Sequence, residues 1–273
     1  MIRLLHVSDL HFGRYSVPAQ VEAFEAFAAS GGAWDAIVVS GDLSQRTRTR
    51  EFRLARAFLD RLGAMAPVLV VPGNHDVAWW MAPLGVGAVG ALYTRYRRDI
   101  SDDLEPVLRR PGLTIAGVNS AHGLRTYTLT TRPRDLSVVG AVRRRQWKHV
   151  ARTFEQTGND LKVLVLHHNV LRGHLSNRWG LASRARGIDD AASTGADLVL
   201  CGHDHEERVE QVQAAGRRFV VSTASTLTTR VRGHRPASFN VVEATAGAIA
   251  VTVMAWSAEG RAFAAGTRRE FAR

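Results

Sequence analysis

The sequence predicts a single-domain α/β protein, and three observations favour this fold class. Short, continuously apolar runs rich in β-branched residues recur along the chain, as in strands that are buried on both faces. Segments with helical periodicity lie between several of these runs. The chain has 273 residues, of which 45% are hydrophobic, and a chain of this length buries roughly three-quarters of its unfolded surface. Intrinsic disorder is therefore excluded, and because no internal repeat or linker is visible we expect one domain over residues 1–273.

The predicted strands occupy residues 4–7, 36–39, 68–71, 114–118, 163–166, 198–201 and 219–221. Helices are predicted over residues 18–29, 50–62 and 141–154, where apolar side chains recur every three or four positions. In the second of these helices, Phe52, Ala55 and Leu59 share one face. The C-terminal part differs, because residues 238–242 and 248–254 flank the turn sequence Ala-Thr-Ala-Gly. This pattern predicts a hairpin that belongs to a second sheet.

The charge balance is strongly basic, with 36 basic and 25 acidic residues and a net charge of +11. Only Lys148 and Lys162 among the basic residues are lysine, which is typical of an arginine-biased composition. A basic surface attracts anionic partners, but a solvated arginine-rich surface is the simpler interpretation. Nucleic acid is therefore not the favoured partner.

The sequence also predicts a cytoplasmic protein. Cys201 is the only cysteine, so no intrachain disulfide can form and a reducing compartment is expected. The N-terminal residues lack the apolar region of a signal peptide. The uncharged run 77–94 is interrupted by proline and glycine and is shorter than the ~20 apolar residues of a membrane span. We therefore expect no membrane association.

Polar residues gather where five of the predicted strands end. These residues are Asp9 and His11, Asp42, Asn74 with His75 and Asp76, His167 with His168, and His203 with His205. Sites in open α/β sheets form outside the carboxyl ends of the strands, so these side chains are expected at one rim. Each group alone is typical of an ordinary turn, but five such groups at strand ends indicate a shared site.

The donor chemistry of this set is that of a metal centre. Asp9, His11, Asp42, Asn74, His167, His203 and His205 offer oxygen and imidazole donors without a thiolate. Such donors suit Mn, Fe, Zn or Co. Seven donors are too many for one tetrahedral ion, whereas two ions that share a bridging carboxylate would use them all.

These motifs resemble those of a known superfamily. Asp9-Leu-His11, Gly41-Asp42, Gly73-Asn74-His75-Asp76, His167 and Gly202-His203-Asp204-His205 are similar to the five blocks of the calcineurin-like metallophosphoesterases, in family order. The opening His-Val-Ser-Asp-Leu-His-Phe-Gly is most similar to the bacterial branch that contains the class III cyclic nucleotide phosphodiesterases. The resemblance implies a four-layer α-β-β-α sandwich with two mixed β-sheets.

The resemblance also implies a role for each site residue. Asp9, His11 and His205 would bind one metal ion, Asn74, His167 and His203 would bind the other, and Asp42 would bridge them. His75 would be the proton donor or transition-state stabiliser, and Asp76 would orient it. His168 would lie in the outer shell or at the substrate rim. A metal-bound hydroxide would then attack phosphorus.

The function expected on this basis is hydrolysis of a small phosphodiester, with a cyclic nucleotide as one candidate. The alternatives are a phosphomonoesterase and an Mre11-like nuclease, although the DNA-capping domain of the latter would need more chain than follows His205. A non-enzymatic scaffold with a vestigial site would usually lack ligands, and all seven are present here.

A substrate flap is predicted as an insertion over residues 77–110, because this stretch has no strong strand signal and follows the third motif directly. Trp79 and Trp80 would either form the wall of a substrate pocket or pack in the core. The alternative use of this apolar segment is a homodimer interface. Arg46, Arg48 and Arg50 would either contact phosphate or form a solvated helix start.

Overall fold

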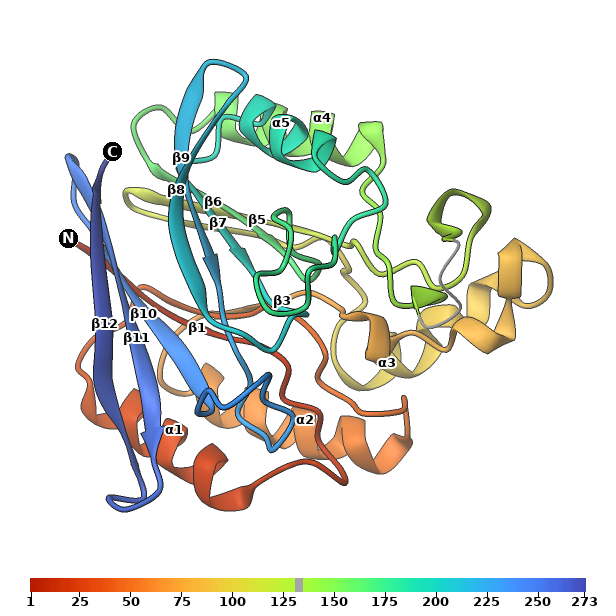
Figure 1. The fold of residues 1–273 in the computed structure, drawn as a ribbon, viewed down its shortest axis with the longest axis horizontal. Coiled ribbons are helices and arrows are strands. Elements are labelled where there is room, and N and C mark those ends of the chain that lie inside the picture. Colours follow the sequence, from red (N-terminus) through yellow and green to blue (C-terminus); the bar gives the residue numbers. More distant parts are fainter. Residues whose placement is uncertain (131–134) are drawn as a thin grey trace.

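Two six-stranded mixed sheets face each other, with helices on their outer sides (Figure 1). The computed structural model describes residues 1–130 and 135–273. Helices α1 (Pro18–Ser30) and α2 (Thr49–Gly63) cover the first sheet, and α4 (Arg144–Glu155) and α5 (Arg186–Ser193) cover the second (Figure 1). This arrangement confirms the predicted four-layer α-β-β-α sandwich.

The first sheet combines the two ends of the chain. In spatial order it contains β12 (Ala262–Ala272), β11 (Ala248–Ser257), β10 (Ser238–Ala244), β1 (Ile2–Val7), β2 (Ala36–Val39) and β3 (Val68–Val70). Strands β1, β2 and β3 are parallel, while β10 runs antiparallel to β1 with Leu4 opposite Val242. The predicted C-terminal hairpin is confirmed, but its assignment to a second sheet was wrong, because β10 pairs with the otherwise open edge of β1.

The second sheet is formed by the middle of the chain. In spatial order it contains β4 (Val107–Arg110), β5 (Leu113–Val118), β6 (Leu161–Leu166), β7 (Leu198–Cys201), β9 (Arg217–Thr223) and β8 (Arg208–Ala214). Strands β5, β6, β7 and β9 are parallel. The carboxyl ends of β5, β6 and β7 therefore meet at one edge, as those of β1, β2 and β3 do in the first sheet.

The core has three main layers of apolar side chains. One lies between the sheets and includes Val38 and Val165, both fully buried. A second lies between the first sheet and its helices, around Phe24 and Phe58. The third lies between the second sheet and its helices, around Phe154. The two sheets are therefore held rigidly against each other, which fixes the relative position of the loops at their common edge.

Three strands, β4, β8 and β12, were not predicted from the sequence. Each lies at an edge of its sheet and mixes apolar residues with arginine or glutamate, a pattern that protects an edge from further pairing. Helix α5 was also missed. It is only eight residues long and contains glycine and two aspartates.

The structure divides the predicted insertion over residues 77–110 into two parts. Helix α3 (Thr94–Asp99) packs against α2 through the fully buried Tyr96, and β4 pairs with β5, so this half belongs to the body of the domain. The other half is an excursion of short 3₁₀ turns, η2 (Trp79–Met81), η3 (Pro83–Gly85) and η4 (Val89–Tyr93). Its ends meet where the Ala78 N–H donates to the Leu92 carbonyl at 3.0 Å.

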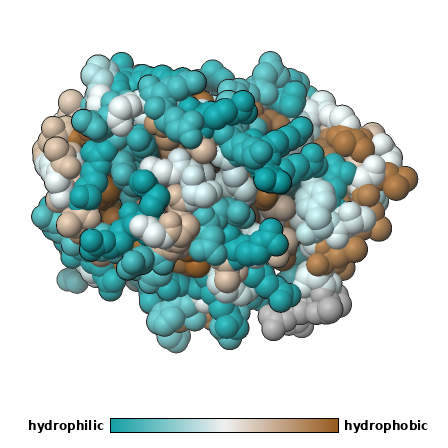
Figure 2. Space-filling model, turned by 90° about the horizontal axis from the view of Figure 1, so that it is seen from above, coloured by the Kyte–Doolittle hydropathy of each residue, from teal (hydrophilic) through white to brown (hydrophobic). Residues whose placement is uncertain are grey.

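The excursion is the most apolar part of the surface drawn in Figure 2, at the end of the molecule where it projects in Figure 1. Its exposed apolar side chains are Trp80, Met81, Leu84, Val86 and Val89. A further 3₁₀ turn, η5 (Thr126–Thr128), follows β5. In residues 1–130 and 135–273, no helix combines the length and the apolar character that crossing a membrane requires.

Candidate metal centre

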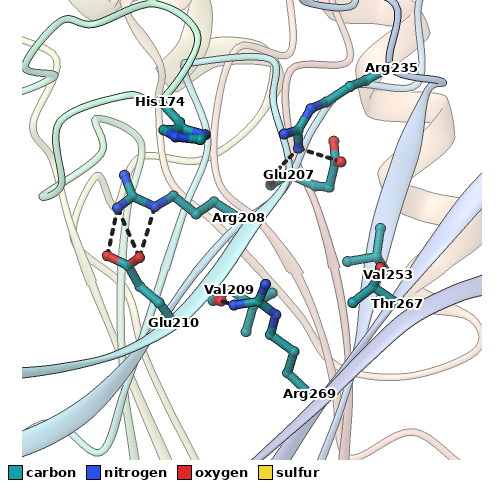
Figure 3. A pocket seen from close by; sticks show the side chains of 9 residues that line it. All are labelled: His174, Glu207, Arg208, Val209, Glu210, Arg235, Val253, Thr267 and Arg269. Atoms are coloured by element: carbon teal, nitrogen blue, oxygen red, sulfur yellow. Dashed lines mark hydrogen bonds and ion pairs between the residues drawn. The ribbon is translucent and has the colours of Figure 1, made fainter.

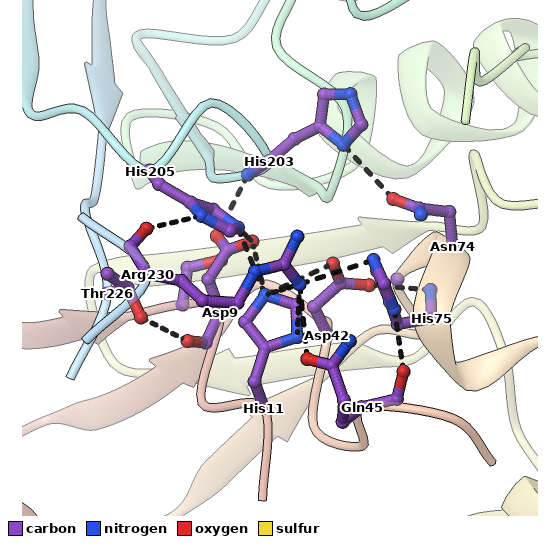
Figure 4. A network of polar contacts seen from close by, with 12 residues as sticks. Asp9, His11, Asp42, Gln45, Asn74, His75, His203, His205, Thr226 and Arg230 are labelled. Atoms are coloured by element: carbon purple, nitrogen blue, oxygen red, sulfur yellow. Dashed lines mark hydrogen bonds and ion pairs between the residues drawn. The ribbon is translucent and has the colours of Figure 1, made fainter. Parts of the chain in front are cut away.

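The five predicted motifs lie together at the common edge of the two sheets, and residues of the first, second, third and fifth are labelled in Figure 4. The loops after β1, β2 and β3 approach from the first sheet, and those after β6 and β7 approach from the second. Six of the seven predicted ligands are at most 8% exposed, and His203 is half-buried. The prediction that distant segments share one rim therefore agrees with the structure.

The first group of donors consists of Asp9, His11, Asp42 and His205. The two imidazole Nε2 atoms of His11 and His205 are 3.0 Å apart. The Asp9 Oδ1 atom lies 3.1 Å from Nε2 of His205 and 3.7 Å from Nε2 of His11. Nε2 of His11 is also 3.7 Å from Oδ2 of Asp42. Four donor atoms thus surround one small space.

The second group consists of Asn74, His167 and His203. The Asn74 Oδ1 atom lies 3.2 Å from Nε2 of His167 and 3.1 Å from Nδ1 of His203. These two ring nitrogens are 3.3 Å apart. Oδ1 of Asp42 is 3.4 Å from Nε2 of His167. Asp42 therefore presents one carboxylate oxygen to each group.

The residues fit a metal centre in two respects. Donors that share an ion at ~2.1 Å lie about 3–3.5 Å from one another, which is close to the separations within each group. In addition, the buried Oδ1 of Asp9 has no hydrogen-bond partner among the described residues. A buried carboxylate oxygen without a partner is costly in a stable fold, and a cation in this space would satisfy it.

His167 and His205 each use Nδ1 for a hydrogen bond outside the centre, so that Nε2 faces the donor groups. Nδ1 of His167 donates to the Ser40 carbonyl at 2.8 Å, and Nδ1 of His205 donates to the Arg230 carbonyl at 2.6 Å. Because these bonds place a proton on Nδ1, Nε2 of each ring is the nitrogen that faces the donor group. Backbone carbonyls commonly fix metal-binding histidines in this way.

Burial and neighbouring charge shift the pKa values of the site. Burial lowers the pKa of His11 to about 4 and that of His203 to about 3, so both rings are neutral, the form that binds metal. Burial also acts to lower the pKa of His167, but the carboxylate of Asp42 outweighs it and raises that pKa to about 9. The Cys201 thiol is buried as expected, and burial raises its pKa to about 12, so it is not a nucleophile.

The backbone at the site is strained in a regular way. Asp9, His11, Asp42, His203 and His205 all have positive φ, between 40° and 77°. Non-glycine residues in this region cost free energy and persist where the surrounding structure enforces them, commonly at functional sites. The strain turns each side chain from the end of its strand into the common space.

Two glycines make the close approach of these loops feasible. A Cβ atom on Gly73 would overlap the carboxylate of Asp42. One on Gly202 would overlap the Ser8 hydroxyl and lie 2.5 Å from Oδ2 of Asp9. The glycines of the third and fifth motifs are therefore needed because the ligands occupy the space of a side chain.

His75 is held by a different residue from the one expected. Its Nδ1 donates to the Gln45 carbonyl at 2.7 Å, and its backbone N–H donates to Oδ1 of Asp42 at 2.8 Å. Asp76 does not contact the ring. It accepts the backbone N–H groups of Leu43, Ser44 and Gly73 at 2.8–3.1 Å, and so ties the loops after β2 and β3 together. The prediction that Asp76 orients His75 was wrong, because the Asp76 carboxylate instead accepts hydrogen bonds from the turn η1 (Asn74–Asp76) and from the neighbouring loop.

Of the two places suggested for His168, its position behind the ligands agrees with the outer shell and not with the substrate rim. It is fully buried, with Nδ1 2.8 Å from the Ser120 hydroxyl and Nε2 2.8 Å from the Val138 carbonyl. Its ring packs 4.6 Å from that of His203 and 5.0 Å from that of His167. Both ring nitrogens of His168 already have hydrogen-bond partners, so this residue supports the second group from behind. One of these nitrogens nevertheless lies close to the donor atoms of His167 and His203.

Sequence reasoning missed Gln45 and Arg230. The Arg230 guanidinium lies among His11, Gln45 and His75, with Nη1 3.1 Å from Oε1 of Gln45 (Figure 4). Gln45 is three residues beyond Asp42 and could have been noticed. Arg230 lies 25 residues beyond His205, in a loop whose sequence gives no signal.

Two cavities open beside this centre and share Gln45, Arg46 and Arg48. The first, of about 530 Å³, also exposes Asn74, His75, Trp79 and Trp80. The second, of about 490 Å³, also exposes Arg14, Tyr15 and Arg50. Of the two roles considered for the tryptophans, the pocket wall agrees with this position.

The sequence profile described as calcineurin-like phosphoesterase matches residues 2–207. The chain belongs to this family. Membership implies a phosphoester hydrolase that uses metal ions, and the two donor groups provide a candidate site for them. None of the curated proteins compared with the chain matches it.

Solved structures agree with the family fold. A purple acid phosphatase from yellow lupin seeds is similar over the whole chain, with a TM-score of 0.68 and 10% identity. The chain covers only 54% of that phosphatase. GAP50 of Plasmodium, described as an anchor in the inner membrane complex, has a TM-score of 0.55 and 14% identity over 93% of this chain and 84% of its own. At these identities the likeness establishes the fold alone.

Proposed function

We propose that the protein is a dinuclear metal-dependent phosphodiesterase that hydrolyses a small phosphodiester, a cyclic nucleotide being one candidate. The observation that carries this proposal is the position of Asp42, whose two oxygens face two separate donor groups. In this proposal one ion is held by Asp9, His11 and His205, the other by Asn74, His167 and His203, and Asp42 bridges the two.

The residues of the chain would divide the chemistry as follows. Two bound cations would neutralise the phosphate oxygens and make a water molecule between them more acidic. His75, fixed through Nδ1 by the Gln45 carbonyl, keeps Nε2 available to hold a proton and give it to the leaving alkoxide. The buried walls around Asp9 and His167 exclude water from the rest of the centre.

The two cavities favour a diester over a monoester. A diester carries two organic groups on one phosphate, and the cavities diverge from Gln45, whose carbonyl holds His75. The cavity with Trp79 and Trp80 offers aromatic surface to a base or sugar. Because Trp79 and Trp80 of the 3₁₀ excursion line this cavity, the excursion would limit the size of the substrate and so disfavour a polymer.

A kinetic screen of the Mn-loaded protein tests the proposal. The substrates are bis(p-nitrophenyl) phosphate, p-nitrophenyl phosphate, cyclic nucleotides, glycerophosphodiesters and single-stranded DNA. We expect a small diester to be hydrolysed fastest. A faster reaction with the monoester would indicate a phosphomonoesterase, and a faster reaction with DNA would indicate an Mre11-like nuclease. Elemental analysis should give about two ions per chain, and one ion with full activity would contradict the dinuclear site.

A further inference from the structure

Arg230 places a positive charge at the open side of the donor groups. Its Nη1 atom lies 3.4 Å from both ring nitrogens of His11 and 3.5 Å from Nε2 of His75. Its only hydrogen-bond acceptor among the described side chains that is not an imidazole is Oε1 of Gln45, at 3.1 Å. A guanidinium among imidazoles and a neutral amide, in a site proposed to hold cations, has no anion to balance it.

The missing counter-ion distinguishes Arg230 from two arginines that line another cavity. In a cavity of about 320 Å³ beside β8 and β12, Arg208 binds Glu210 and Arg235 binds Glu207, at 2.8 and 2.6 Å (Figure 3). In the part of the chain that the structure describes, no carboxylate forms an ion pair with Arg230. In that cavity two of the three arginines are paired with glutamates, whereas Arg230 lies at the open side of the donor groups without a carboxylate partner.

The position of Arg230 is fixed by the surrounding loop. Its backbone N–H donates to the Thr228 hydroxyl at 3.1 Å, and its carbonyl accepts from Nδ1 of His205 at 2.6 Å. The guanidinium packs over the Tyr15 ring at 5.4 Å. Gln45 holds His75 through its carbonyl and Arg230 through its side chain, so the two groups are set side by side. This is a prearranged position and not the random placement of an exposed side chain.

We propose that Arg230 binds the non-bridging oxygens of the substrate phosphoryl group, with Gln45 and Tyr15 as its positioning residues. The inference rests on the proposed function, because it assigns a residue to the same phosphoester. Its chemistry is that of a guanidinium, which matches phosphate with two parallel N–H donors. Arg230 lies on the side facing His75, where it can hold the phosphoryl group against the metal ions while His75 serves the leaving group.

Binding of inorganic phosphate to the Mn-loaded protein tests this role without relying on turnover. Calorimetry would compare the unchanged protein with Arg230→Gln and Arg230→Lys, and elemental analysis would follow the metal content. Arg218→Gln is the matched control, since Arg218 is exposed near the start of β9, at the end of the strand away from the centre, and its change removes the same charge. We expect Arg230→Gln to weaken phosphate binding about 10- to 100-fold with both ions retained. Arg230→Lys should lose less, and the control should change by less than about twofold because its charge is distant and screened.

Several results would contradict this role of Arg230. Unchanged phosphate affinity in Arg230→Gln, or an equal loss in the control, would overturn it, and so would loss of metal in step with phosphate. If Arg230→Gln does not fold, Arg230→Lys takes its place. An unchanged phosphate affinity in Arg230→Lys would also overturn the role of Arg230, because the two parallel N–H donors of the guanidinium would then not matter. Phosphate binding that depends on Arg230 in a protein that hydrolyses no phosphoester would uphold the site and refute the proposed function. If the protein hydrolyses phosphoesters but its phosphate affinity does not depend on Arg230, the proposed function would stand and the role of Arg230 would be refuted.

Discussion

The floor of the site and its rim are built in opposite ways. On the floor, Asp9, His11 and His167 are fully buried, and the side chains of Asp9 and His167 make short hydrogen bonds to the backbone. At the rim, Trp80 is 49% exposed, and in the described residues the guanidinium groups of Arg46 and Arg48 have no ion pair. The floor sits on strand ends from both sheets, whereas the rim sits on 3₁₀ turns and loops.

This difference separates two kinds of control. A buried and strained floor can fix metal geometry to a fraction of an ångström, because few rearrangements are open to it. An exposed rim can vary without unfolding the domain, so it is suited to select the substrate. Changes in the floor should therefore abolish the reaction, and changes in the rim should alter its preference.

The largest effect is expected from Asp42→Asn. Because Asp42 faces both donor groups, its change should weaken both metal sites at once. We expect a greater loss than the ~10–100-fold typical of outer-shell substitutions. Turnover and metal content measured together would check this, and near-normal turnover would remove Asp42 from the bridging position.

A smaller but still severe effect is expected from His75→Ala. His75 is not one of the seven predicted ligands: its Nδ1 donates to the Gln45 carbonyl and its ring packs edge-on against that of His11, so both ions should remain bound. The rate should fall by roughly 10²–10⁴, the usual contribution of a positioned acid or base. A series of aryl diesters would show the loss shrinking as the leaving group improves. An equal loss across the series would instead point to electrostatic stabilisation, and loss of metal would make His75 a ligand.

The packing of the floor is tested by Gly202→Ala. The added methyl group would overlap Ser8 and approach Asp9, so we expect a destabilisation of about 1–3 kcal/mol together with weaker metal binding. Gly63→Ala is the matched control, because no atom lies within 4 Å of its Cβ position at the end of α2. The control should be neutral or stabilising by up to about 1 kcal/mol. Chemical denaturation with and without metal measures both, and equal effects of the two changes would contradict the close approach.

Changes at the rim should have the smallest effect on catalysis and the largest effect on substrate preference. Residues 79–91 can be replaced by a short Gly/Ser linker, since Ala78 and Leu92 already meet through a backbone hydrogen bond. This design keeps the buried Tyr96 and the strand β4, which removal of the whole 77–110 segment would destroy. Metal content should stay the same while the ranking of substrates changes, with DNA gaining relative to small diesters.

An unchanged ranking would show that the excursion does not shape the substrate cavity. Trp80→Ala provides a milder version within the full-length excursion, and its effect should lie mainly in KM because the ring lines the cavity without belonging to either donor group. Measurement of the oligomeric state in the same preparations would show whether the exposed apolar residues serve instead as a contact between two copies.

The sequence by itself determined the central strands and the candidate ligands. Strands such as β2 and β6 are continuous apolar runs, because both of their faces are covered. Asp9, His11 and Asp42 could be recognised because residues with metal-binding side chains directly follow such runs, and the chemistry of a residue type does not depend on where it lies.

Only the tertiary structure decided which distant residues complete the site. Arg230 and Gln45 are 185 positions apart and meet through the folding of two loops, so no local pattern marks them. The place of β10 beside β1, the edge strands, and the use of Asp76 to tie two loops instead of holding His75 were likewise beyond local reasoning. The physical reason is the same in each case. A side chain's partner is set by packing and hydrogen-bond satisfaction across the whole chain, whereas periodicity and motif spacing report only on its sequence neighbours.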